Sequence, residues 1–443
     1  MKTILVLGAG LVTRPLVCYL LDNPDFRLVV ASRTVSKAEK LIDGHPRGEA
    51  KTLLVQDKAS LQDLISESDL VISLVPYAYH VDVAKLCLEL GKPMVTTSYV
   101  SDAMRALDGD AQEKGLLILN EIGVDPGIDH MSAMKIIHGV QNRGGKIISF
   151  RSYCGGLPAP EANTNPFGYK FSWSPRGVVL AGKNTGRYLE DGKEVFVPSK
   201  DLFAHTWTIG IEGVGMLTAY PNRNSIPYIE LYGLGDIKTM YRGTLRYPGW
   251  CETWKKFADL GLLDDEERTG LAGQTFAQFT QTFIGTPTGS LKSDLSKQLD
   301  IPEGSDIMDR FEWLGLLSDD PLPVESGSPL DILAAKLLEK MPYEKGERDM
   351  IVLHHEFIAE YPELPAKEMI TSSLVDFGIP NGDSAMARTV SLPAAIAAKM
   401  ILHGEITATG VHIPVLPDIY EPVLKELERL GIRFKEKTRK LAS

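Results

Sequence analysis

Short apolar runs alternate with helical patterns over the first 125 residues of the chain. Between the runs, apolar residues recur every three or four positions, as on one face of a helix. The runs have strand length and cover residues 3–7, 28–31, 52–55, 70–75, 94–96 and 116–120. Strands that alternate with helices predict βαβ units and therefore a parallel sheet.

The pattern changes beyond Gly127, where we place a domain boundary. Residues 147–153 predict a strand and residues 155–173 a long loop. Residues 250–340 are helical in pattern, and two similar stretches within them predict helices that end at a glycine C-cap. Strand-like runs return later, and a last apolar helix follows. These elements are expected at residues 350–356, 368–376 and 392–403.

A glycine turn follows the first predicted strand and leads into an apolar helix. In this context Gly8 permits a tight turn, and Gly10 permits close approach of backbone N–H groups to a pyrophosphate. The third glycine of the usual fingerprint is replaced by Thr13, so the motif depends on its position between strand and helix. It predicts a dinucleotide site.

The second strand ends in Ser32, Arg33 and Thr34. An enzyme that prefers NAD normally has Asp or Glu here to bind the ribose 2′-hydroxyl. A guanidinium instead pairs with phosphate oxygens, which a carboxylate would repel. The sequence therefore predicts NADP as the cofactor, with a solvated surface arginine as the alternative for Arg33.

Other polar residues follow strands of the same sheet. Ligands of open parallel sheets bind beyond the carboxyl ends of the strands. Three segments are expected there, on the nicotinamide side of the cofactor: Val75 with Pro76, Thr97 to Tyr99, and Val124 to Pro126.

Composition excludes several function classes. A formal charge of −11 disfavours nucleic acid and anionic membrane surfaces as partners, and no run of about 18 apolar residues predicts a membrane span. The four cysteines form no CxxC pair, which argues against zinc and disulfides and favours the reducing cytoplasm. His80 and His130 lack metal-ligand spacing, so no metal is expected and both are interpreted as structural.

Cationic residues nevertheless gather in three loop-like segments, at residues 170–176, 221–224 and 242–247. Several arginines in an acidic protein can bind a di- or tricarboxylate by bidentate pairing. Each one taken singly can instead be a surface ion-pair residue.

Six motifs together resemble the saccharopine reductase family, the glutamate-forming saccharopine dehydrogenases. They are GLVTRP at residues 10–15, VTTSYVS at 95–101, NEIGVDPGIDH at 120–130, YCGGLPAPE at 153–161, GYKFSWS at 168–174 and RGTLRY at 242–247. The resemblance extends from about residue 3 to about residue 435. It implies NADP-dependent interconversion of saccharopine with glutamate and 2-aminoadipate 6-semialdehyde, a step of lysine metabolism.

The resemblance also implies a domain layout and a homodimer. Residues 1–127 are expected to form a Rossmann NADP-binding domain that residues 390–443 complete. Residues 128–250 and 341–389 are expected to form an α/β domain for substrate binding and dimerisation, and residues 251–340 a small helical subdomain.

The family's binding residues carry over onto matching positions. The saccharopine site would contain Ser98, Tyr99, Asp125, Arg223, Thr244, Leu245 and Arg246. The NADP site would contain Gly10, Leu11, Val12, Thr13, Ser32, Arg33, Thr34, Val75, Thr97, Ser98, Val124, Asp125, Pro126 and Ser174.

Asp125 and Tyr99 are the candidates for the chemical step. Oxidation of a secondary amine to an imine requires the neutral amine, and water then hydrolyses the imine. Asp125 can orient the amine, accept its proton, or serve only as a turn residue. Tyr99 can donate to the substrate or act as a packing aromatic. Cys154 lies close to this site but has no histidine placed to activate it.

Two other functions stay open at this point. A related amine dehydrogenase, such as one acting on carboxynorspermidine, would use a diamine, although Arg223 and Arg246 favour several carboxylates. A non-catalytic NADP-binding regulator could also use this fold. The direction of flux, towards lysine synthesis or breakdown, is not encoded in these motifs.

Overall fold

The computed structural model describes residues 1–173, 175–363 and 366–441, so the predicted cofactor contact Ser174 lies outside the described residues. The chain forms two compact units. The first unit contains Met1–Ile147 and Ala359–Ser443, and the second contains Ile148–Ile358. Strands β7 (Lys146–Pro158) and β13 (Asp349–Glu360) each run across a boundary between the units along the chain.

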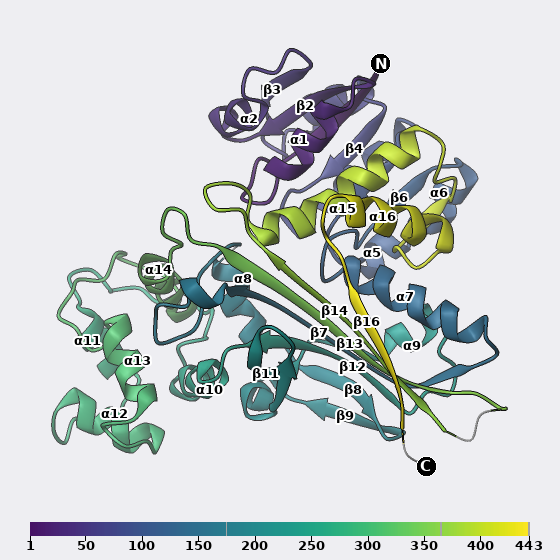
Figure 1. The fold of residues 1–443 in the computed structure, drawn as a ribbon. Helices are drawn as coiled ribbons and strands as arrows, with labels where there is room; N and C mark the ends of the chain where they lie inside the picture. Colours follow the sequence, from purple (N-terminus) through teal and green to yellow (C-terminus); the bar gives the residue numbers. More distant parts are fainter. Residues whose placement is uncertain (174, 364–365, 442–443) are drawn as a thin grey trace. The chain divides into compact units, whose positions relative to one another are not determined.

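A parallel sheet of seven strands is the centre of the first unit (Figure 1). Its order is β15-β6-β5-β4-β1-β2-β3, and every pair of neighbours is parallel. The strands are β1 (Lys2–Leu7), β2 (Phe26–Ser32), β3 (Gly48–Thr52), β4 (Leu70–Ser73), β5 (Met94–Thr96), β6 (Leu117–Leu119) and β15 (Gly410–His412). The strand order reverses at β1 and β4, where ligands of doubly wound sheets bind. The predicted α/β class with a Rossmann-type domain is confirmed.

Helices connect these strands and bury apolar side chains against the sheet. They are α1 (Arg14–Asp22), α2 (Val35–Ile42), α3 (Lys58–Ser66), η1 (Tyr77–Tyr79), α4 (His80–Glu89), α5 (Asp102–Arg105), α6 (Asp108–Glu113), α7 (Ile128–Gln141), α15 (Ala385–Leu402) and α16 (Pro417–Arg429).

Five of the six strands predicted for this region are confirmed, with ends that differ by up to two residues. The predicted strand at residues 52–55 is wrong, because β3 precedes it and ends at Thr52. This edge strand contains Glu49 and Lys51 and has no apolar run. Edge strand β15 was not predicted either.

Helix α15 begins earlier than predicted, since Ser384 accepts a hydrogen bond from the N–H of Ala387 and caps the helix. Pro393 lies within the helix. By length and composition α15 can span a membrane, but 72% of its residues are buried inside the structure, and it packs against α1. Core helices commonly have this composition.

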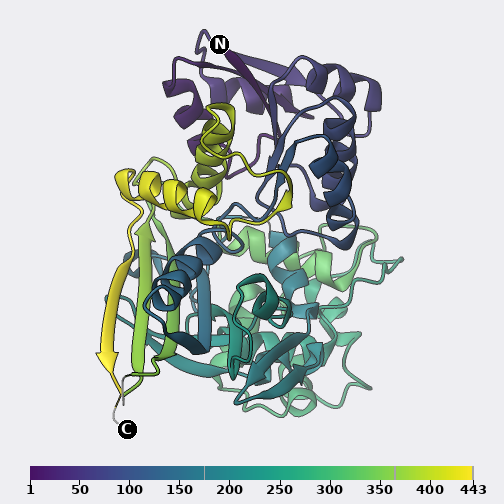
Figure 2. The same cartoon turned by 90° about the vertical axis from the view of Figure 1, so that its right-hand side faces the viewer.

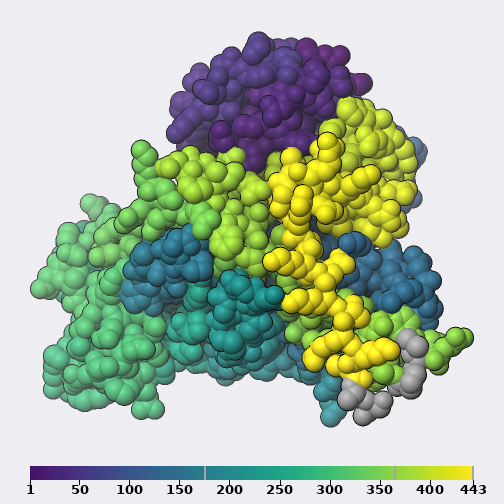
Figure 3. Space-filling model, in the orientation of Figure 1, coloured from purple at the N-terminus to yellow at the C-terminus, as the bar shows by residue number. Residues whose placement is uncertain are grey.

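Strands β14 (Glu368–Phe377) and β16 (Lys435–Lys440) pair antiparallel in the first unit. Figures 1 and 2 show them side by side, in green and yellow. Every residue of β16 is exposed, and Figure 3 shows the yellow C-terminal segment on the surface. Its sequence, KEKTRK, has no apolar position, which explains why this strand was not predicted.

The second unit is built on a mixed sheet. Within it β7 pairs parallel with β12, whereas β11 pairs antiparallel with β10 and β12. Strand β8 pairs with β9 and β12. Besides β7 and β13, its strands are β8 (Gly186–Glu190), β9 (Lys193–Val197), β10 (Trp207–Ile211), β11 (Gly215–Pro221) and β12 (Thr239–Arg246). Strand β7 continues to Pro158, so the predicted loop starts later than expected.

A cluster of helices completes the second unit and encloses an aromatic core that includes Trp250, Trp254 and Phe311. Figure 1 shows α11, α12 and α13 grouped together. The helices are η2 (Pro160–Ala162), α8 (Pro175–Leu180), η3 (Ala181–Lys183), η4 (Ser199–Ala204), α9 (Pro227–Leu231), α10 (Trp250–Leu260), α11 (Phe276–Gln281), α12 (Leu291–Leu299), α13 (Asp306–Leu314) and α14 (Pro329–Lys340). Both predicted glycine C-caps are confirmed, at Gly261 and Gly315, which have left-handed backbone angles.

The compact units differ in extent from the predicted domains. Helix α7, which the sequence assigned to the substrate domain, belongs to the first unit, as does β14. Residues 251–340 belong to the second unit.

One ion pair of the second unit is nearly buried and provides a test of its stability. Lys170 Nζ donates to both carboxylate oxygens of Glu347 at 2.6 Å, and only 5% of the lysine side chain is exposed. We expect Lys170→Met to lower the free energy of unfolding by about 3 kcal/mol, because it leaves Glu347 without its buried counter-charge. Urea unfolding can be followed by tryptophan fluorescence, since all five tryptophans lie in the second unit.

The control is the exposed pair of Lys183 with Asp265, whose side chains are 39% and 45% exposed. Lys183→Met should cost less than about 1 kcal/mol. Equal losses for the two variants would contradict the importance of burial at Lys170.

Candidate active site

The glycine turn is closed by hydrogen bonds at both of its ends. The N–H of Gly8 donates to the carbonyl of Ala31 at 2.8 Å, so the turn lies beside the end of β2. Gly8 has φ +113°, and a Cβ there would lie 2.9 Å from the carbonyl oxygen of Leu74. Any other residue would be strained, both by this backbone angle and by the close approach of the chain after β4.

Thr13 replaces the third glycine and has a role of its own. Its side chain is fully buried, and its hydroxyl oxygen accepts from the N–H of Gly10 at 3.0 Å. The residue therefore fixes the turn at the start of α1. The amides of Leu11 and Val12, in contrast, have no acceptor within the part of the chain that the structure describes. Two N–H groups at the start of a helix are suited to bind a pyrophosphate.

The end of β2 is suited to a 2′-phosphate. Arg33 is exposed and forms no ion pair with any residue that the structure describes. The backbone N–H of Thr34 donates to Ser32 Oγ at 3.4 Å, so the Ser32 side chain folds back on the turn that follows the strand. The structure thus places Gly8 to Thr13 and Ser32 to Thr34 at neighbouring strand ends, as NADP requires.

Buried polar side chains link the next strand ends. The His80 ring lies between Ser73 at the end of β4 and Ser98 beyond β5, with N···O distances of 2.9 and 2.8 Å. Burial lowers the pKa of His80 from its ordinary 6.5 to about 4, so the ring is neutral at pH 7. Sequence reasoning treated His80 as structural and missed its contact with Ser98.

The loop from Asn120 to Gly127 lies against the segment after β5. The N–H of Glu121 donates to the carbonyl of Ser98, and the N–H of Ile122 to the carbonyl of Thr96. Gly123 packs against Thr97, where a Cβ would be 3.3 Å from the threonine Cβ. These contacts bring Thr97 and Ser98 close to Val124 and Pro126.

Tyr99 and Asp125, the two predicted catalytic residues, contact each other. The Tyr99 hydroxyl donates to Asp125 Oδ1 at 3.2 Å, and both side chains are half-buried. The peptide bond between Asp125 and Pro126 is cis. A phenol donor facing a carboxylate acceptor fits a protonated Tyr99 and an ionised Asp125. Both candidates for the chemical step therefore meet in one place.

Buried polar side chains also contact this loop. Glu121 Oε2 is 2.8 Å from His130 Nε2, and Glu121 Oε1 accepts from the N–H of Val100 at 2.9 Å. Asp129 accepts from the N–H of Gly127 at 2.6 Å. Sequence reasoning gave Glu121 no role, although it lies in one of the recognised motifs. No group of three or more His, Cys, Asp or Glu side chains suited to a metal ion occurs among the described residues.

The second unit holds four of the predicted saccharopine-site residues, and two of these, Arg223 and Arg246, are the predicted carboxylate-binding cations. Arg223 is exposed and follows β11 with φ +56°. Thr244, Leu245 and Arg246 end β12, where Thr244 faces Tyr220 and Cys154 on the neighbouring strands. A Cβ at Gly155 would lie 2.8 Å from Leu245 Cβ, so this glycine makes room for Leu245.

Arg246 is the unusual side chain of this group. It is only 5% exposed, and its Nη1 donates to the carbonyl of Leu245 at 2.8 Å. Aromatic rings surround its guanidinium, at centroid distances of 5.0 Å for Tyr169, 5.4 Å for Trp250 and 5.9 Å for Tyr220.

The Arg246 cation lacks a carboxylate partner among the described residues, and its Nε has no acceptor there. Burial raises the pKa of Tyr169 and Tyr220, although Arg246 opposes this, so both are neutral phenols at pH 7. A buried charge without a counter-ion is costly. An anionic ligand would supply the missing partner.

The remaining cations predicted in this unit are used within the protein. Lys170 pairs with Glu347, and Arg176 pairs with Asp331 at 2.7 Å. The guanidinium of Arg242 lies over Tyr228, 4.5 Å from the ring centroid. The two cations of the first cationic segment, Lys170 and Arg176, are therefore each paired with a carboxylate of the protein itself.

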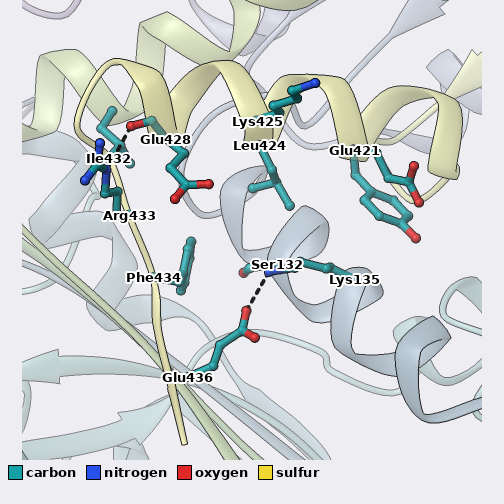
Figure 4. A pocket seen from close by; sticks show the side chains of 11 residues that line it. Ser132, Lys135, Glu421, Leu424, Lys425, Glu428, Ile432, Arg433, Phe434 and Glu436 are labelled. Carbon is teal, nitrogen blue, oxygen red and sulfur yellow. Dashed lines mark hydrogen bonds and ion pairs between the residues drawn. The ribbon is translucent and has the colours of Figure 1, made fainter. Parts of the chain in front are cut away.

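Two surface cavities lie away from the predicted site. One, of about 470 Å³, lies between α7 and α16 in the first unit and includes the ion pair of Lys135 with Glu436 (Figure 4). The other, of about 560 Å³, is in the second unit and is lined by Tyr153, Tyr188 and Trp207. Neither contains a predicted site residue.

Arg33 provides a test of the cofactor preference. We expect Arg33→Ala to raise the Kd of NADPH about 10- to 150-fold and to leave the Kd of NADH nearly unchanged, because one charge-assisted pair contributes about 1.5–3 kcal/mol. Nucleotide fluorescence titration gives both constants. Arg27→Ala is the control, since Arg27 lies on β2, the strand that precedes Arg33, and is paired with Glu49. Equal losses for the two nucleotides would exclude a 2′-phosphate contact.

Two family models match the chain. The saccharopine dehydrogenase NADP binding domain matches residues 4–119, and the saccharopine dehydrogenase C-terminal domain matches residues 123–432.

Curated proteins and a solved structure agree with these matches. The chain is 42% identical to saccharopine dehydrogenase [NADP(+), L-glutamate-forming] of Schizosaccharomyces pombe, over 98% of this chain and 99% of the relative. It is 38% identical to the mitochondrial alpha-aminoadipic semialdehyde synthase of Mus musculus, over 98% of this chain and 47% of the relative. The apo structure of saccharopine dehydrogenase (L-Glu forming) from Saccharomyces cerevisiae is 41% identical and superposes with a TM-score of 0.90, covering 99% of this chain and 100% of that one.

Proposed function

The chain belongs to the saccharopine dehydrogenase family, and we propose that it converts saccharopine, NADP and water reversibly into L-glutamate, 2-aminoadipate 6-semialdehyde and NADPH. One observation in the structure carries this proposal. Arg246 is a buried cation whose missing partner is an anion, and saccharopine has three carboxylates.

The first unit supplies the residues that fit NADP. The amides of Leu11 and Val12 can bind the pyrophosphate, and Arg33 can bind the 2′-phosphate. When bound, NADP would supply the hydride acceptor for the carbon that becomes the aldehyde, which is bonded to the secondary amine on the side away from the glutamate portion.

Asp125 and Tyr99 act on the amine. An ionised Asp125 accepts a hydrogen bond from the amine and so holds the amine in place. Tyr99 donates to Oδ1 of the same carboxylate and fixes its orientation. Oxidation of the neutral amine would give a protonated imine. Water adds to the imine carbon and gives up one proton to solvent, and the C–N bond then breaks to release the amine of glutamate and the semialdehyde.

Arg246 fixes a substrate carboxylate. Its guanidinium is held by a backbone carbonyl and three aromatic rings, so it needs little reorganisation when the anion binds. Preorganised charge in a site shielded from water contributes more than an exposed pair. This arrangement favours an anionic substrate over the diamine of a carboxynorspermidine dehydrogenase.

Homodimerisation and a cytoplasmic location remain predictions from the sequence. Gel filtration with light scattering tests the first, and imaging of the tagged protein in its own cells tests the second.

The direct test is NADPH formation at 340 nm with the purified protein and saccharopine. We expect saccharopine-dependent reduction of NADP and no reduction with carboxynorspermidine. Activity only with carboxynorspermidine would assign the related dehydrogenase. NADP binding without turnover of either compound would assign a regulator.

Arg246→Gln tests the carboxylate contact. We expect kcat/KM for saccharopine to fall about 10- to 150-fold, since one charge-assisted hydrogen bond is lost. Arg176→Gln removes an exposed cation that is already paired with Asp331, and it should change kcat/KM for saccharopine by less than about twofold. Unchanged kinetics in Arg246→Gln would remove Arg246 from the substrate site.

Asp125→Asn separates the two roles of Asp125. If the carboxylate only orients the amine, kcat/KM falls while the shape of the pH–rate profile is kept. If it accepts the proton, the limb of the profile that belongs to it disappears. We expect the first result, because Tyr99 already donates to Asp125. Unchanged activity in Asp125→Asn would show that Asp125 serves only as a residue of the turn.

A further inference from the structure

We propose that His80 is a positioning residue that turns the Ser98 hydroxyl into a hydrogen-bond donor towards bound substrate or cofactor. The hydrogen bonds run from Ser73 through His80 to Ser98. This proposal rests on the proposed function, because Ser98 is a ligand contact only through the family motif at residues 95–101.

Three strand and helix ends meet at this ring. Ser73 is the last residue of β4, His80 is the first of α4, and Ser98 follows β5 by two residues. Ser73 Oγ is 2.9 Å from His80 Nδ1, and Ser98 Oγ is 2.8 Å from His80 Nε2. Both ring nitrogens are therefore occupied by serine hydroxyls.

The two serines at the ends of this hydrogen-bond series differ in burial. Ser73 is completely buried and His80 is 4% exposed, whereas Ser98 is half-buried. Of the three hydrogen-bonded residues, Ser98 is thus the one whose side chain can reach a ligand.

Ser73 sets the direction of the hydrogen bonds. Within residues 1–173, 175–363 and 366–441, the Ser73 hydroxyl has no hydrogen-bond partner other than His80 Nδ1. A buried hydroxyl that donates to nothing is costly. Ser73 therefore donates to Nδ1, and a neutral ring must then carry its hydrogen on Nε2.

The Nε2 hydrogen points to Ser98. Thr96 Oγ1 also lies near Nε2, but at the longer distance of 3.4 Å, and it accepts from the N–H of Ser98. Since Ser98 Oγ accepts from His80, its own hydrogen is directed elsewhere. A carboxylate of the substrate or the carboxamide oxygen of the cofactor is a suitable acceptor.

The tautomer can be measured without any turnover. In protein labelled with ¹⁵N-histidine at pH 7, we expect the His80 resonances of a ring protonated at Nε2 and bare at Nδ1, assigned by their loss in His80→Gln. Ser73→Ala should weaken this preference, while Ser66→Ala, which removes an exposed serine hydroxyl, should not. A ring protonated at Nδ1 in the unaltered protein would overturn the proposal.

A double-mutant cycle tests whether His80 acts through Ser98. We expect His80→Leu and Ser98→Ala each to lower kcat/KM for saccharopine about tenfold, as for the loss of one hydrogen bond. The double variant should match Ser98→Ala within about twofold. Losses that multiply would show that His80 supports only the fold and would overturn the proposal.

Conservative replacements sharpen this result. His80→Gln places an amide donor where Nε2 was and should recover more kcat/KM than His80→Asn, which reaches only the position of Nδ1. Equal activity of the two would contradict donation to Ser98. If the purified protein did not turn over saccharopine, the proposed function would be refuted. The double-mutant cycle of His80 and Ser98, measured on the Kd of NADPH in place of kcat/KM, would then decide the role of His80.

Discussion

The parallel pairing of β1 with β2 and β4 determines where chemistry can occur in the first unit. Each parallel strand ends at the same edge of the sheet, so the residue that follows it is brought to that edge whatever its position in the sequence. Gly8 and Asp125 are more than a hundred positions apart in the sequence. Even so, Gly8, Arg33, Ser98 and Asp125 all follow strands of this one sheet, namely β1, β2, β5 and β6.

A second constraint acts in the other unit, where the charge of Arg246 is enclosed by aromatic rings. These rings exclude water and hold the guanidinium by cation–π attraction, but they do not neutralise it. The Leu245 carbonyl lowers the cost of burying the Arg246 charge when no ligand is bound, and a bound anion would lower this cost further. Lys170 illustrates the alternative, since its charge is neutralised within the protein by Glu347.

Sequence patterns predicted the centre of the fold well and its edges poorly. Strands such as β4 and β5 are buried on both faces and are therefore continuous apolar runs. Edge strands β3 and β16 contain charged residues and carry no such signal. The cofactor turn was predictable because Gly8 is required by a backbone angle. His80 was not, because its importance depends on two serines that only the folded sheet brings to its ring. The same holds for Arg246, whose lack of a partner cannot be deduced from its neighbours in sequence.

The path of the chain through the first unit also affects how this protein can fold during synthesis. Strand β15 pairs with β6, and α15 packs on α1, although about 290 residues separate Leu119 from Gly410. A ribosome therefore completes every strand of the second unit before it produces α15, the helix that covers α1. Until then α1 presents an apolar face to water, and the nascent nucleotide-binding half is exposed to aggregation and to chaperones for most of the translation time.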